Sequence, residues 1–207
     1  VITKDTLLNL SDYYKEVLFY FLCEGDFKTV VNVDFNNGVT VSISGSDKSN
    51  YEVIFIDSDT EKVHYRTNIK CGEWARCNIE YYVNWEVLVF RDGQLYYQEE
   101  FSVNGENVLI DIVSNSLGDN LAYIPYCEEF RKKYNCNVFV KCNVSKILDY
   151  PELNFVKSRE GKYYSSYKIS WFYIGEEFNL MMHPVDFKPQ PMQKTATDIL
   201  GLDYVEL

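Results

Sequence analysis

Hydrophobic and polar positions alternate along the first half of the chain, which is the pattern of half-buried β-strands. One alternation runs from Val31 to Phe35 and a second from Val39 to Ile43. Asn37-Gly38 lies between them, and this dipeptide favours a type I′ turn. These residues therefore predict a β-hairpin.

The same pattern predicts further strands over residues 51–56, 63–69, 79–90 and 94–103, the last after an Asp92-Gly93 turn. Short strands joined by tight turns are typical of an antiparallel β-sandwich or small barrel. We expect residues 1–106 to form this β-rich domain, although residues 1–26 are compatible with either short helices or a strand. Its tyrosines could form a platform for a sugar or a partner, but cross-strand packing is the simpler interpretation of Tyr81, Tyr82, Tyr96 and Tyr97.

From residue 107 the pattern changes to buried strands that alternate with helices. Val108 to Val113 is a β-branched apolar run broken only by Asp111, as expected for a strand in a parallel sheet. Helical spacing begins at Leu121, with Leu121, Ile124, Phe130 and Tyr134 on one face and Pro125 in the opening turn. Residues 137–142 read as a second buried strand, so the region predicts a β-α-β unit with a right-handed crossover.

The rest of the chain continues this α/β pattern. We expect a short helix over residues 145–150 and strands over 153–157 and 163–174. A last helix is predicted over 192–200, opened by Pro191 and ended by Gly201. The predicted fold class is thus α+β followed by α/β, with a Rossmann-like domain over residues 107–207.

The polar turn between the first buried strand and its helix contains the main candidates for chemistry. It reads Ser114-Asn115-Ser116-Leu117-Gly118-Asp119-Asn120, and it lies at the carboxyl end of a strand, where open α/β sheets bind ligands. Asp119 could act as a catalytic acid or base, but Asp119 or Asn120 could equally cap the helix. The turn lacks the glycine-rich fingerprints of nucleotide-binding loops.

Composition narrows the classes of function. The 207 residues carry a formal charge of −11, which disfavours binding to nucleic acid or to an anionic membrane. We find no targeting segment or membrane-inserting run and expect a cytoplasmic protein. The first residue is not methionine, so we expect a piece of a longer chain.

The cysteines and histidines do not match a known metal-site pattern. None of the six cysteines forms C-x-x-C, and the spacing of Cys136, Cys142 and His183 fits no standard zinc site. We therefore expect free thiols and no metal in this chain. His64 and His183 have no identifiable catalytic partner in the sequence, so structural roles are expected for both.

Three segments, in order, resemble one enzyme family. The first is YEVIFIDSDTEKVHYRTNIKCGEWARCNIEYYVNWEVLVFRDGQLYYQEE, the second IDIVSNSLGDNLAYIPYCEEFRKKYNCNVFV and the third PMQKTATDILGLDY. Together they are similar to the amino-terminal part of the autotransporter strand-loop-strand O-heptosyltransferases, relatives of the lipopolysaccharide heptosyltransferases. Position Tyr123 departs from the tryptophan expected in that family.

The resemblance implies an inverting transfer of heptose from ADP-heptose to Ser or Thr hydroxyls of autotransporter adhesins. It implies that Asp119 is the general base and that the neighbouring turn contributes substrate-binding residues, namely Ser114, Asn115, Ser116, Gly118 and Asn120. It also implies that residues 107–207 are the first Rossmann-like, acceptor-side domain of a GT-B glycosyltransferase. The second domain, which binds most of the donor, would be missing, so the fragment alone should be inactive.

Two other interpretations stay open at the level of sequence. The chain could be a non-catalytic binding or assembly module that recognises an adhesin or forms a homo-oligomer. It could also belong to a GT-B transferase that uses another sugar nucleotide, since the donor-selecting half is absent. Substitution of Asp119 separates catalysis from capping, because loss of a cap costs about 0.5–2 kcal/mol of stability and leaves turnover largely intact.

Overall fold

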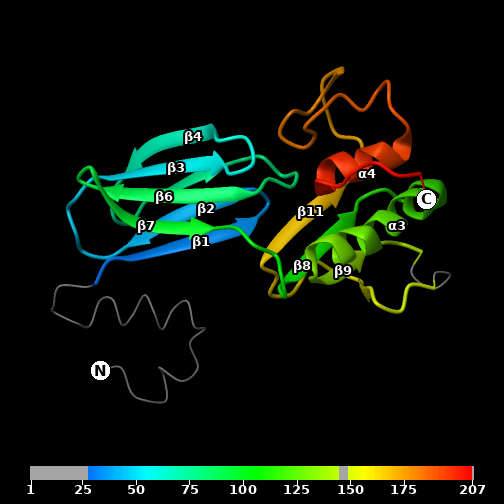
Figure 1. Cartoon of the computed structure of the whole chain (residues 1–207), viewed down its shortest axis with the longest axis horizontal. Helices are drawn as coiled ribbons and strands as arrows, with labels where there is room; N and C mark the ends of the chain where they lie inside the picture. The colour runs from blue at the N-terminus through cyan, green and yellow to red at the C-terminus, as the bar shows by residue number, and fades with distance from the viewer. Residues whose placement is uncertain (1–27, 145–148, 207) are drawn as a thin grey trace, which may run out of the picture.

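The computed structural model describes residues 28–144 and 149–206 and shows two parts side by side (Figure 1). One part is built from β-strands and the other from strands and helices, so the fold is mixed α and β. Within the described residues, strands of the β-rich part are β1 (Val30–Asn36), β2 (Val39–Ser44), β3 (Tyr51–Asp57), β4 (Lys62–Ile69), β5 (Trp74–Cys77), β6 (Trp85–Arg91) and β7 (Gln94–Glu100). The other part contains β8 (Asn107–Ile112), α3 (Leu117–Tyr134), β9 (Asn137–Lys141), β10 (Asn154–Val156), β11 (Ser165–Ile169), β12 (Tyr173–Ile174), β13 (Glu177–Phe178) and α4 (Met192–Leu200).

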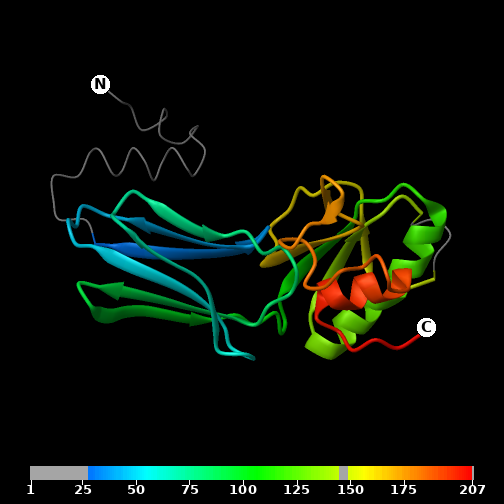
Figure 2. The same ribbon diagram turned by 90° about the horizontal axis from the view of Figure 1, so that it is seen from above.

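The β-rich part consists of two layers of antiparallel strands (Figure 2). One layer is the four-stranded sheet β4-β3-β6-β7, and the other contains β1, β2 and β5. Their inward side chains form one core, with Val41, Val53 and Val87 completely buried. The predicted hairpin is confirmed: Asn37 and Gly38 both have positive φ, at 53° and 96°, as a type I′ turn requires.

The predicted β-α-β unit is also confirmed. Strands β10, β9, β8 and β11 lie in that order and are parallel, which is the third-second-first-fourth arrangement of one half of a doubly wound sheet. Helices α3 and α4 cover one face of these strands (Figure 2). That face is apolar because alternate residues such as Ile110, Val138 and Ile169 point toward the helices and are fully buried.

The two parts pack directly against each other. Strand β1 pairs in parallel with β11, so one seven-stranded sheet runs through both parts. Beside this pairing lies a group of aromatic rings that we call the aromatic seam, which consists of Tyr82, Phe101, Phe130, Tyr134 and Tyr167. The rings of Tyr82 and Tyr134 are stacked, with centroids 4.6 Å apart. The division at residues 106 and 107 stays a prediction.

The start of α3 differs from the sequence-based expectation. The helix begins at Leu117, four residues before Leu121, so Pro125 lies inside the helix and not in its opening turn. Leu121 is exposed, at 44% of its surface, so it does not belong to the face that packs on the sheet. The buried face consists of Asn120, Tyr123, Ile124, Tyr126, Cys127 and Phe130.

Several predicted strands are longer than the observed ones, including the one expected over residues 94–103, which ends at Glu100. The strand expected over residues 79–90 begins only at Trp85, because the preceding backbone bonds to the other part of the molecule: Glu80 N–H donates to Met181 O and Tyr82 N–H to Ile199 O, each at 2.7 Å. The run expected over 163–174 contains β11 and then the short, separate β12. Predictions for residues 1–26 and 145–148 lie outside the described residues.

Candidate active site

Asp119 lies in the first turn of α3, just beyond the carboxyl end of β8. The N-cap of this helix is Ser116, whose side-chain oxygen accepts the Asp119 N–H at 3.4 Å. The alternative that Asp119 or Asn120 caps the helix is therefore wrong. An acidic side chain in the first turn still suits the helix dipole, so Asp119 is placed favourably without being needed as the cap.

The carboxylate of Asp119 is held in one orientation by a neighbouring serine. Ser114 Oγ donates to Asp119 Oδ2 at 2.6 Å and accepts the Ser116 N–H at 3.1 Å. Both Asp119 and Ser114 are only partly buried. The geometry thus presents a half-exposed carboxylate whose direction is fixed by a short hydrogen bond, as a positioned proton acceptor requires.

The side chain of Asn120 forms hydrogen bonds to the backbone of the turn. Its side chain is completely buried, and its Nδ2 donates to Ser114 O at 2.9 Å and to Ser116 O at 2.7 Å. Its Oδ1 accepts the Asn143 N–H at 3.4 Å. Because its polar groups are used within the protein, Asn120 supports the shape of the site, and its predicted contact with substrate stays a prediction.

Asn143 is a residue of this site that the sequence analysis missed. It follows β9, and its Nδ2 donates to Asn115 Oδ1, so it ties the end of β9 to the loop after β8. The sequence did contain a signal for it. The carboxyl ends of adjacent parallel strands meet at one edge of the sheet, and Asn143 directly follows the second predicted strand.

The outer surface of the turn is open. Asn115, Ser116 and Gly118 are exposed. A side chain at Gly118 would meet only Ser116 Oγ, at 3.7 Å, which is ordinary contact. The fold therefore does not require glycine at this position, whereas close approach of a ligand to the helix would.

The surroundings of His183 and of the cysteines fit structural roles. His183 is buried, and its Nε2 accepts the Phe172 N–H at 3.0 Å; burial lowers its pKa to about 4. Burial raises the pKa of the Cys136 thiol to about 11, and the cysteines in the described ranges are free thiols. Over residues 28–144 and 149–206, His, Cys, Asp and Glu side chains form no group of three that could hold a metal ion, so Cys136, Cys142 and His183 do not come together.

The chain has relatives among known proteins. No family model matches the chain. The autotransporter heptosyltransferase Aah of Escherichia coli is 29% identical over 184 residues, which cover 84% of this chain and 45% of Aah. BAHTCr, an autotransporter heptosyltransferase of Citrobacter rodentium, is 28% identical over 181 residues, or 82% of this chain and 42% of that protein.

A solved structure agrees with these relatives. The crystal structure of TibC from enterotoxigenic Escherichia coli superposes with a TM-score of 0.74 at 27% identity, covering 84% of this chain and 46% of TibC. This chain is homologous to the autotransporter heptosyltransferases. The chain spans less than half the length of the relatives that it matches.

The homology confirms the family resemblance that the three sequence segments indicated. TibC is described as an iron-containing, dodecameric glycosyltransferase, so oligomers occur among the relatives. Among the described residues of this chain, no helix is both long enough and apolar enough to span a membrane.

Proposed function

We propose that this chain is the acceptor-side part of a protein O-heptosyltransferase and that Asp119 is its general base. The observation that carries the proposal is the hydrogen bond from Ser114 Oγ to Asp119 Oδ2, which fixes a half-exposed carboxylate beyond the carboxyl end of β8. Ligands of open α/β sheets bind at this edge. The homology to autotransporter heptosyltransferases supports the reaction class.

The proposed reaction is a single displacement with inversion. Asp119 takes the proton from a Ser or Thr hydroxyl of the acceptor as that oxygen attacks the anomeric carbon of heptose, and ADP leaves with the bonding electrons. One carboxylate within hydrogen-bond reach of the hydroxyl suffices for this proton transfer. Ser114 donates to one carboxylate oxygen and thereby orients Asp119 toward the acceptor.

The strand order supports a place for this chain within a GT-B enzyme. The parallel strands β10, β9, β8 and β11 have the order of a nucleotide-fold domain, and we assign them to the first such domain, after an amino-terminal β-sandwich. A related TibC structure is a complex with ADP-D-β-D-heptose, which supports ADP-heptose as the donor. We assign an autotransporter adhesin as the acceptor, a homo-oligomer as the assembly and the cytoplasm as the location.

The assignment of this chain to the acceptor side predicts that it is inactive by itself. We assign most of the donor site to a second domain of the complete enzyme, since the chain spans less than half the length of its relatives. Purified residues 1–207 should not consume ADP-heptose in the presence of an adhesin. Appreciable turnover by the isolated chain would contradict this assignment.

The proposed base is tested by transfer of radiolabelled heptose in the complete protein that carries this chain. The protein and its Asp119→Ala variant are incubated with ADP-heptose and a candidate autotransporter, beside Asp203→Ala, whose carboxylate is fully exposed. We expect label on the adhesin with the parent protein and Asp203→Ala, but not with folded Asp119→Ala. Equal labelling by Asp119→Ala would reject the base assignment, and labelling only from other sugar nucleotides would reject the donor.

A further inference from the structure

The face of the parallel sheet opposite α3 and α4 contains a cavity of about 390 Å³. Alternation along β8 and β11 turns Leu109, Asp111, Ser166 and Lys168 toward this face. A right-handed connection from β10 to β11 must cross the same face, but residues 157–164 form a loop there and not a helix. The cavity exists because this short connection covers the face incompletely.

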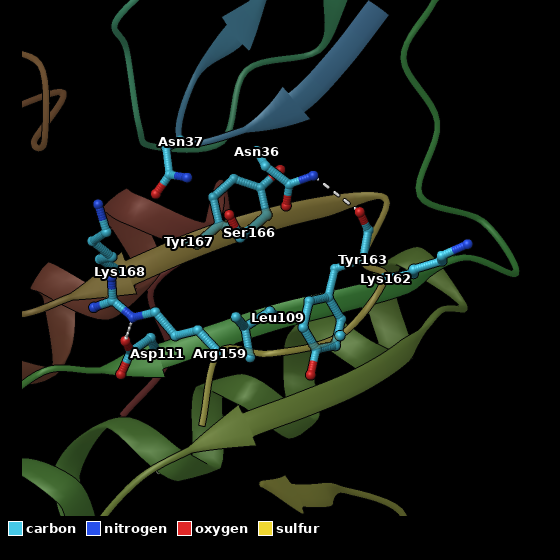
Figure 3. Close-up of a pocket in the computed structure, with 11 residues that line it drawn as sticks. Asn36, Asn37, Leu109, Asp111, Arg159, Lys162, Tyr163, Ser166, Tyr167 and Lys168 are labelled. Carbon is cyan, nitrogen blue, oxygen red and sulfur yellow. Dashed lines mark hydrogen bonds and ion pairs between the residues drawn. The ribbon is translucent and has the colours of Figure 1, made fainter. Parts of the chain in front are cut away.

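The floor of the cavity carries a buried carboxylate between two cations. Asp111 is 1% exposed; its Oδ1 pairs with Lys141 Nζ at 3.0 Å, and its Oδ2 accepts from Arg159 Nε. Figure 3 shows the guanidinium of Arg159 between Asp111 and Lys168. Arginine has five N–H donors, and this pairing through Nε fixes the guanidinium at the cavity wall.

The charge around the cavity is positive, in contrast to the protein as a whole. Lys168 pairs with Glu80 at 2.7 Å, and Lys162 also lines the cavity. The lining thus has three cationic side chains, those of Arg159, Lys162 and Lys168, and one carboxylate, that of Asp111. Lys141 and Glu80 pair with Asp111 and Lys168 from outside the lining and add one charge of each sign. The chain has a formal charge of −11, so this local excess of positive charge favours an anionic ligand.

The rest of the lining includes several polar side chains and comes from both parts of the molecule. Asn36, the last residue of β1, and Asn37, in the turn after it, form one wall, and Asn36 Nδ2 donates to Tyr163 O at 2.9 Å (Figure 3). Ser166 contributes a hydroxyl. Amide and hydroxyl groups both donate to and accept from the hydroxyls of a ligand, and the volume falls within the roughly 300–1,000 Å³ of small-molecule pockets.

We propose that this cavity binds the phosphoryl group of a small hydroxylated molecule, with Arg159 and Lys168 as the phosphate-binding residues. A planar guanidinium fixed by a buried carboxylate suits bidentate binding of phosphate oxygens. The cavity is lined by none of the residues 114–120. It is therefore a second site, and the proposal does not depend on Asp119 or on heptosyl transfer.

The test is isothermal titration of the purified chain with ADP, inorganic pyrophosphate, ribose 5-phosphate and adenosine. We expect the phosphorylated probes to bind and adenosine not to bind, and the relative affinities of the three phosphorylated probes separate a nucleotide from a sugar phosphate. Arg159→Ala should weaken binding about tenfold or more, since the charged hydrogen bonds to phosphate are lost. Lys168→Met should also weaken it and serves as the second variant if Arg159→Ala melts early.

Two matched variants keep the test specific. Arg66→Ala removes another arginine paired with one carboxylate, Glu52, but on β4, away from the cavity lining. Arg66→Ala and Asp119→Ala should both bind the probes like the parent chain. The proposal is overturned if no phosphorylated probe binds, if Arg66→Ala weakens binding as much as Arg159→Ala, or if Asp119→Ala abolishes it.

Discussion

The two ends of α3 are built for opposite purposes. The amino-terminal end lies in polar surroundings, with a serine cap, an exposed glycine and the half-exposed Asp119. The carboxyl-terminal end is packed into the aromatic seam, where Phe130 is fully buried and Tyr134 stacks on Tyr82. The 18-residue helix is about 27 Å long, so the two environments are separated by most of its length.

This difference shows how a rigid element can position a carboxylate without burying it. The seam and the cap of Asn135, which has φ of 49° in the left-handed region, hold the distal end of the helix. Tyr134 Oη also donates to Gly201 O at 2.7 Å, which ties α3 to the end of α4. With its far end anchored in this way, the first turn can stay open to ligands while Asp119 keeps its direction.

The largest expected effect comes from breaking the packed end. Phe130→Ala should lower the free energy of unfolding by about 3–5 kcal/mol, because a buried ring is replaced by a cavity. Leu121→Ala, on the exposed side of the same helix, should change it by no more than about 0.5 kcal/mol. Urea denaturation measures both, and equal losses would contradict the observed orientation of α3.

The second effect depends on pH and concerns the buried side chain of His183. The pKa of His183 is lowered by burial from 6.5 to about 4, so the unfolded chain binds a proton more readily than the folded one. Stability is therefore full above about pH 6.5 and falls as the pH drops toward 4, by up to about 3 kcal/mol. The Tyr51 hydroxyl lowers the pKa of Asp47 to about 2. Asp47 therefore adds to the pH dependence only below about pH 4, where its stabilising contribution is lost as the carboxylate is protonated.

Urea denaturation of His183→Gln between about pH 7 and pH 4 checks this expectation. Glutamine does not titrate and can accept the Phe172 N–H that His183 now accepts. The pH dependence should become much shallower in His183→Gln than in the parent chain. His64→Gln is the comparison: burial also lowers the pKa of His64, but this side chain is only partly buried, so the slope should change less than in His183→Gln. An unchanged slope in His183→Gln would disprove the assignment.

A smaller loss of stability is expected from removing the cap at the amino-terminal end of α3. Ser116→Ala removes the N-cap of α3 and should cost about 0.5–2 kcal/mol in urea denaturation. Ser116→Asp should recover most of this loss, because aspartate is an equally good N-cap. If Ser116→Ala is as stable as the parent chain, Ser116 does not cap the helix.

The smallest change in stability is expected from adding a methyl group in the first turn of α3, which leaves its N-cap in place. Gly118→Ala should stabilise α3 by no more than about 1 kcal/mol, because the added methyl group meets only Ser116 Oγ. In the complete enzyme the same methyl group should nevertheless reduce heptose transfer, since it stands where we expect the acceptor to approach. Unaltered transfer by Gly118→Ala would place the acceptor elsewhere.

Elements with a local sequence signal could be predicted, whereas contacts between distant residues could not. Hairpin β1–β2 and strands β8 and β9 were predicted because binary alternation and β-branched runs are local signals. The predicted start of α3 is too late, although Ser116-x-x-Asp119 has the spacing of a capping box, because the apolar periodicity begins only at Leu121. Asp111 stood out as the charge in a buried strand, but its partners Lys141 and Arg159 lie 30 and 48 residues away, and no local pattern brings them together.

The central claim is tested most directly by the steady-state kinetics of Asp119→Asn in the complete enzyme. Asparagine has the same shape and can still accept the Ser114 hydroxyl, so folding and substrate binding should be retained. If Asp119 is the general base, kcat should fall by about 10²–10⁴ with little change in KM for ADP-heptose or the adhesin. A kcat close to that of the parent enzyme, at equal thermal stability, would show that Asp119 is not the base.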